Sequence, residues 1–272
     1  MNRQVELFLR TVRGRAYPRV VGSLRERAGI IWEVTLPLIT MTAFVFVYRT
    51  LSAPEEYIGF VVMGGAMTAF WLNVLWSMAA QLYWDKDQGN LALYILAPGP
   101  MMAILLGMAL GGMMWTMSRA VAIVAAGTLL FGVQFSTANL ALLALIFFLT
   151  MAALYGMGML FASLFLFFGR EAWHITNLFQ EPVYLLSGFY FPVKALGPWV
   201  AAAASLIPLT LGLDAMRQLL FPQNTLFGFL SVPVEIAILV VLAVVMIGAA
   251  RFSLQRLETL SRRHGRLTDR RG

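Results

Sequence analysis

Few side chains in this sequence could do chemistry, and their spacing favours none of the common catalytic or metal sites. The chain has no cysteine and only His174 and His264, so neither a thiolate site nor a histidine cluster can form. Asp85 and Asp87 flank Lys86, but two acids without a third ligand are weak evidence for a metal, and a salt-bridging role is preferred. No Gly-x-x-x-x-Gly-Lys-Ser/Thr sequence is present to cradle the phosphates of ATP. The sequence therefore predicts that the chain is not an enzyme and holds no metal or cofactor of its own.

The composition indicates a helical integral membrane protein. Hydrophobic residues make up 60% of the 272 residues and charged residues 12%, and the mean hydropathy is +0.78. Charged residues are about a quarter of an ordinary soluble domain. The apolar runs reach the length of about 20 residues that a helix needs to cross a bilayer. The net charge of +7 comes largely from seven basic residues within 3–27 and seven within 251–271. Because both groups flank apolar runs, they favour contact with membrane lipids over nucleic acid.

We expect one transmembrane domain over 1–272, of the all-α class. Residues 1–29 resemble an interfacial amphipathic helix, broken around Pro18, and 251–272 form a basic cytoplasmic tail. The segment 192–228 is apolar but interrupted by prolines, which favours short re-entrant helices between spans five and six. Six spans are expected within 30–250, at about 30–50, 57–81, 102–132, 138–168, 173–191 and 230–250.

The distribution of basic residues predicts the orientation. With both termini in the cytoplasm, 16 of the 20 Lys and Arg residues lie on the cytoplasmic side and 3 lie outside. The loop 85–98 between spans two and three then faces the cytoplasm. The expected location is a bacterial plasma (inner) membrane, which the chain crosses several times.

This cytoplasmic loop is built as a short capped helix. Asn90 is a good N-cap residue, Gly89 permits the preceding turn, and Pro98 ends the helix. Residues 91–97 between them are all apolar or aromatic. A helix this apolar needs a surface to lie against, which could be the membrane, the spans of the same chain, or a groove on a soluble partner.

Three segments in order resemble the transmembrane permeases of bacterial ATP-binding-cassette exporters of the type-2 class. Residues 87–91 and 96–98 resemble the family's acidic-x-Gly-Thr-Leu … Leu-x-x-Pro loop. The sequence LLSGFYFPVKALGPWV, at 185–200, resembles its Ser-Gly-x-x-Phe-Pro segment followed by Leu-Pro-x-Trp. The sequence IPLTLGLDAMRQLLF, at 207–221, resembles its Asn-Pro-Leu-Thr … Ala-x-Arg segment. With the six-span layout, the resemblance extends over nearly the whole chain.

The resemblance implies a half-transporter that works with other subunits. A second permease copy would complete the pathway, and two cytoplasmic ATPase subunits, which bind ATP and Mg, would drive it. The chain departs from the family pattern where Asn90 replaces Thr, Ala92 replaces Glu and Ile207 replaces Asn. The residues that the resemblance assigns to contact with the ATPase are Asp87, Gly89, Asn90, Leu91, Leu96 and Pro98.

Charged residues inside the spans need partners, because a charge at the centre of a membrane helix costs at least ~2.5–3.5 kcal/mol. Arg119 could line a pathway, or it could pair with Gln134, with a backbone carbonyl or with an acid on a neighbouring span. Glu181 could be a gate or a satisfied interfacial acid. Glu33 and Glu235 are expected at the interfaces, and an ion pair at i, i+3 is expected between Asp214 and Arg217.

Aromatic and small residues leave two further alternatives open. An aromatic set could line a hydrophobic route or could form interface belts and helix contacts. A small-residue face on the third span predicts close helix packing, with the seam between two permease copies as one place for it. The aromatic set is Phe70, Trp71, Trp76, Phe189, Tyr190, Phe191 and Trp199, and the small residues are Gly107, Gly111 and Gly112.

The expected function is ATP-driven export of a hydrophobic or amphipathic compound, either drug-like or a lipid, because the spans carry few polar groups to hydrate a glycan. Two alternatives are export of a lipid-linked glycan by the same architecture and a stand-alone secondary carrier, which would favour broken spans at the membrane centre and an internal repeat. A membrane enzyme would need clustered acids with a metal, or a His/acid pair, and neither is found.

Overall fold

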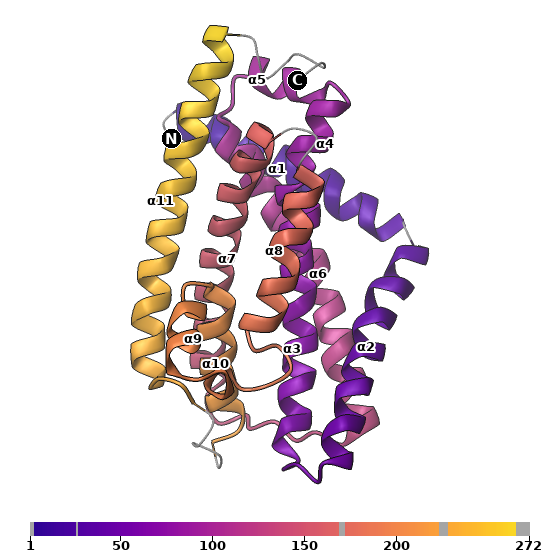
Figure 1. Ribbon diagram of the computed structural model, residues 1–272. Coiled ribbons are helices and arrows are strands. Elements are labelled where there is room, and N and C mark those ends of the chain that lie inside the picture. The colour runs from indigo at the N-terminus through magenta and orange to yellow at the C-terminus, as the bar shows by residue number, and fades with distance from the viewer. Residues whose placement is uncertain (1–2, 26, 169–171, 223–227, 265–272) are drawn as a thin grey trace.

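The computed structural model describes residues 3–25, 27–168, 172–222 and 228–264, and within these ranges all the regular secondary structure is helical. Long helices run side by side as a bundle, with short helices at both ends (Figure 1). In chain order the elements are α1 (Arg3–Arg25), α2 (Arg27–Thr50), α3 (Glu56–Leu72), the π-helix η1 (Asn73–Ala79), α4 (Gln81–Asp87), α5 (Asn90–Leu96), α6 (Met101–Phe131), α7 (Leu140–Phe168), α8 (Ala172–Leu186), the 3₁₀ turn η3 (Val193–Leu196), α9 (Pro198–Ala204), α10 (Pro208–Leu220) and α11 (Val232–His264).

Four helical segments are long and apolar enough to cross a membrane. They are 56–87, 101–131, 140–166 and 232–259. The spans expected near 57–81, 102–132, 138–168 and 230–250 are therefore found. The spans expected at 30–50 and 173–191 correspond to α2 and to α8, which has only 15 residues. Neither of these two meets the length and hydropathy of a span among the described residues, so six spans are not confirmed.

The segment between the last two expected spans forms two short helices, as predicted. α9 and α10 meet at an angle of 110°, the geometry of a broken span or a re-entrant loop. Pro198 and Pro208 each begin a helix, where the missing backbone N–H of proline costs nothing. This pair lies at the end of the bundle opposite α5 (Figure 1).

The first helix differs from the prediction in one respect. α1 continues through Pro18 without a break, although an interior proline usually costs about 3 kcal/mol. It crosses the bundle near the end that carries α4 and α5 (Figure 1). Close packing on α6 holds it there, because the backbone of α1 at Val12 and Ala16 lies directly over Gly107 and Gly111, where no Cβ would fit. The small-residue face is thus used for close packing, but with α1 of the same chain.

The centre of the bundle is the continuous segment of α3, η1 and α4, which is the most enclosed of the candidate spans. Trp71 and Phe70 are fully buried in it, and α2, α6 and α7 surround it. The π-helix η1 lies within this core, and the Tyr155 hydroxyl of α7 donates to Asn73 Oδ1 at 3.1 Å. The same segment emerges from the bundle as α4, so the core and the start of the loop 85–98 are parts of one helical run.

Candidate functional site

The end of the bundle that carries α5 is shaped by one tight turn. α4 ends at Asp87, and Gly89 takes the left-handed conformation, with φ of 83°, that favours glycine. α5 then runs over Asn90–Leu96 and ends where Ala97 becomes extended, one residue before Pro98. The helix is therefore confirmed, but its predicted N-cap is wrong. Gly89 occupies the N-cap position, and the Asn90 side chain instead donates to Gln88 Oε1 at 3.3 Å.

The apolar side chains of α5 divide between two faces. Leu91 is 1% exposed and lies in the hydrophobic core, so it anchors the helix and is not available to a partner protein. Leu93 and Leu96 are 65% and 81% exposed. Asp87 and Pro98 are also exposed beside them. Among the side chains of α5 whose burial is described, the outward ones are therefore Leu93 and Leu96, and sequence reasoning had named Leu91 instead of Leu93.

A buried carboxylate holds α5 against two other helices. Asp85 in α4 is 3% exposed and accepts three hydrogen bonds, from Arg15 Nη2, Gln81 Nε2 and the Tyr94 hydroxyl, each at 3.1 Å. The Arg15 guanidinium of α1 also lies 5.2 Å from the centre of the Tyr94 ring. Burial, followed by the neighbouring Asp85 carboxylate, raises the pKa of Tyr94 to about 12. Asp85 therefore joins α1, α4 and α5, and its salt bridge lies inside the chain and not on an outer face.

Two further contacts fix the same end of the molecule. The Glu258 carboxylate of α11 accepts a hydrogen bond from the backbone N–H of Met101, the first residue of α6. A carboxylate at this position satisfies a free N–H and complements the helix dipole. Arg19 of α1 donates to the backbone carbonyl of Ser77 in η1. No group of three or more metal-ligating side chains occurs among the residues that the structure describes.

Comparison with known protein families decides the identity of this helical bundle. A model of the family described as "ABC-2 type transporter" matches residues 20–221, about three quarters of the chain. The chain belongs to the ABC-2 type transporter family. No curated protein matches the sequence. As a member of this family, the protein is a transmembrane permease subunit of an ABC transporter and is not itself the catalytic subunit.

Within the permease, Arg119 is paired with an acid on a neighbouring helix, one of the partners that the sequence left open. Its Nη1 lies 2.5 Å from Glu33 Oε2 of α2, and its Nη2 donates to Thr116 Oγ1 at 3.0 Å. The Arg119 side chain is 9% exposed and the Glu33 side chain 45% exposed. This pair crosses from α6 to α2 and leaves no uncompensated cation in the span.

The segment 187–192 of the permease is tied to the core by Arg217. The Arg217 guanidinium donates to the carbonyls of Gly188 at 2.6 Å, Phe189 at 2.7 Å and Phe60 at 2.9 Å. Asp214 instead accepts from the backbone N–H of Phe229 and from Gln218, so the ion pair predicted between Asp214 and Arg217 is not formed among the described residues.

The aromatic candidates for a pathway differ in exposure. Phe189 is fully buried and therefore packs in the core of this chain. Tyr190 is half-buried and stacks on Phe44 of α2 at 4.3 Å between ring centres, and Phe191 is also half-buried. Glu181 is exposed on α8 and accepts a hydrogen bond only from its neighbour Gln180 among the described side chains. None of the hydrogen bonds, ion pairs or ring contacts described for Arg119, Glu181 and residues 189–191 joins the three to one another.

Proposed function

We propose that this permease exports an amphipathic compound, and that a separate cytoplasmic ATPase, which docks on α4 and α5, drives the export. The observation that carries the proposal is the exposure of Leu93 and Leu96 on a helix whose other face is anchored. Two exposed leucines on a rigid helix suit a groove on a partner protein, because helix-in-groove recognition uses apolar anchors on one helical face. A loosely attached helix would bind a partner more weakly, because ordering it on binding costs conformational entropy.

The arrangement of the elements supports a mechanical connection from this helix to the bundle. A displacement of α5 acts on α4 through the hydrogen bond between Tyr94 and Asp85, and on α1 through Arg15. Since α4, η1 and α3 form one nearly continuous helical run, movement of α4 reaches the buried core directly. η1, the π-helix in that run, interrupts the regular α-helical hydrogen bonding, and π-helical segments are frequent at functional sites.

The wider assembly follows from the same proposal. The end bearing α5 faces the cytoplasm, together with both chain termini, in a bacterial inner membrane. A second copy of this chain completes the transporter as a homodimer, and ATP and Mg are bound by the ATPase. The amphipathic nature of the cargo is supported by the few polar side chains in the spans.

The test is co-purification of the tagged full-length chain from its native membrane in a gentle detergent. The expected result is that an ATPase accompanies the wild-type chain in comparable amount and is lost when Leu93 and Leu96 are both changed to Glu. Leu206→Glu is the matched control, because Leu206 is 67% exposed but lies between α9 and α10 at the opposite end. Retention of the ATPase by Leu93→Glu/Leu96→Glu, or equal loss with the control, would contradict docking on α5.

A further inference from the structure

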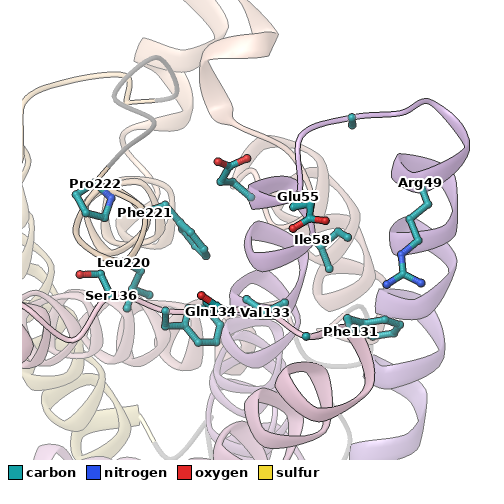
Figure 2. Close-up of a pocket in the computed structure, with 14 residues that line it drawn as sticks. Arg49, Glu55, Ile58, Phe131, Val133, Gln134, Ser136, Leu220, Phe221 and Pro222 are labelled. Carbon is teal, nitrogen blue, oxygen red and sulfur yellow. The ribbon is translucent and has the colours of Figure 1, made fainter.

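The end of the permease opposite α5 contains a cavity of about 710 Å³. Three parts of the chain line it, namely the turn between α2 and α3, the connection from α6 to α7, and the end of α10 (Figure 2). The backbone N–H of Ser136 donates to the Leu220 carbonyl at 2.9 Å, which joins two of these walls. A volume of this size accommodates a small molecule or the head of a lipid.

The floor of the cavity is apolar. Ile58, Val133, Leu220 and Phe221 line it, and each is at most 9% exposed. The Phe221 ring packs against α3 at Gly59, where a Cβ would overlap it, so this part of the floor is fixed. Such a floor favours the apolar part of a ligand by the ordinary gain from burying hydrocarbon.

The rim of the cavity carries charges of both signs that do not pair with each other. Arg49 is exposed at the end of α2, and its guanidinium lies 5.7 Å from the centre of the Phe131 ring. Glu55 and Glu56 stand at the start of α3, exposed and half-buried respectively. Figure 2 shows Arg49 reaching toward Phe131 while Glu55 lies beside Ile58. Among the described residues, no ion pair involves Arg49 or either glutamate.

We propose that this cavity binds an amphiphile whose head carries both a phosphate and an amine, as in a phosphatidylethanolamine. The Arg49 guanidinium, with its planar fork of donors, would take the phosphate. The Glu55 and Glu56 carboxylates would take the ammonium group, and the first part of the acyl chains would lie on the floor formed by Val133, Leu220 and Phe221. The proposal goes beyond the proposed function, because recognition at this end of the chain requires neither ATP nor an ATPase.

The test is native mass spectrometry of the full-length chain titrated with short-chain lipids. Dihexanoyl-phosphatidylethanolamine is the probe, and dihexanoyl-phosphatidylglycerol, which has the phosphate but no amine, is the comparison. The wild-type chain is expected to bind the first more tightly. Glu55→Gln with Glu56→Gln should weaken binding of the ethanolamine lipid, by about fourfold for each carboxylate about 5 Å away in a water-like dielectric, and should strengthen binding of the glycerol lipid. Arg49→Gln should weaken both.

The controls are Glu181→Gln and Arg251→Gln, which remove the same charges from exposed sites outside the cavity lining. Variants of Arg49, Glu55 and Glu56 that behave like these controls would overturn the proposal, as would equal binding of the two lipids by the wild-type chain. Competition by free phosphoethanolamine uses the unaltered protein and so does not depend on how the variants fold. If the free headgroup binds as tightly as the lipid, the apolar floor has no part in recognition and the lipid assignment is wrong.

Discussion

Replacing Asp85 by Ala should loosen the attachment of α5 to α4. Asp85 is the one side chain that accepts hydrogen bonds from Arg15, Gln81 and Tyr94 together, and it is 3% exposed. Its removal leaves the Tyr94 hydroxyl and the Arg15 guanidinium without their acceptor. α5 has only seven residues, too few for a stable helix in isolation, so its order depends on these contacts and on Leu91.

The size of the effect follows from the one hydrogen bond that joins Asp85 to α5, from the Tyr94 hydroxyl, because Gln81 lies in α4 and Arg15 in α1. A hydrogen bond to a charged group contributes about 1.5–3 kcal/mol when it is well buried. The Tyr94 side chain is half-buried, and water partly replaces its lost partner, so a contribution of about 1 kcal/mol is appropriate for this bond. This loss of about 1 kcal/mol corresponds to an increase of about fivefold in the equilibrium constant for local opening of α5. Asp85→Asn keeps an oxygen acceptor for the Tyr94 hydroxyl, so a smaller increase is expected.

Amide hydrogen exchange over residues 90–97 measures this opening, because protection of a local segment reports its opening free energy. The matched control is Asp87→Ala, two residues away, where the carboxylate is exposed. Exchange in α5 should rise about fivefold in Asp85→Ala and stay unchanged in Asp87→Ala. Equal protection in the two variants would refute the conclusion that Asp85 holds the helix in place.

Three further predictions concern other contacts in the permease. Glu33→Ala should lower the thermal stability more than Glu33→Ala combined with Arg119→Ala, because the single change leaves a buried cation without its partner; equal melting temperatures would contradict this. Gly107→Leu should separate α1 from α6, seen as increased proteolysis within residues 3–25, and unchanged proteolysis would count against the close contact. The pKa of Tyr94 is raised to about 12 from 10, so the stabilisation by its neutral hydroxyl is complete below about pH 10 and is lost as the pH rises toward about 12. Ultraviolet difference titration of the wild-type chain against Tyr94→Phe measures the ionisation of this hydroxyl. Ionisation near pH 10 would show that the ring is not buried.

The sequence was sufficient to find α5 but not to say which way it faces. Gly89 and Pro98 are strong local signals because they act through backbone conformation, and the helix lies within one residue of its predicted position. Residues 91–97 are all apolar or aromatic, so no polar face distinguishes the buried side from the exposed one. The burial of Leu91 and the exposure of Leu93 follow from packing against α4, α6 and α11, which a local pattern does not contain.

Partners of charged residues were predictable as a class but not as individuals. An acid on a neighbouring span was expected among the possible partners of Arg119, and Glu33 is that acid. Its selection depends on how α2 crosses α6. Arg217 shows the opposite outcome, since the spacing to Asp214 favours an ion pair, yet three backbone carbonyls of the Gly188 turn and α3 satisfy it better. Continuation of α1 through Pro18 likewise depends on tertiary packing over Gly107 and Gly111.

The most direct test of the central claim is site-specific photo-crosslinking in the native membrane. A photoreactive amino acid at position Leu96, or at Leu93, should form a covalent adduct with an ATPase subunit, identified by mass spectrometry. The same amino acid at Leu206, which lies between α9 and α10 at the end opposite α5, should form none (Figure 1). Adducts with an ATPase from both ends, or none from α5 while the ATPase co-purifies, would show that α5 is not the surface on which the ATPase docks.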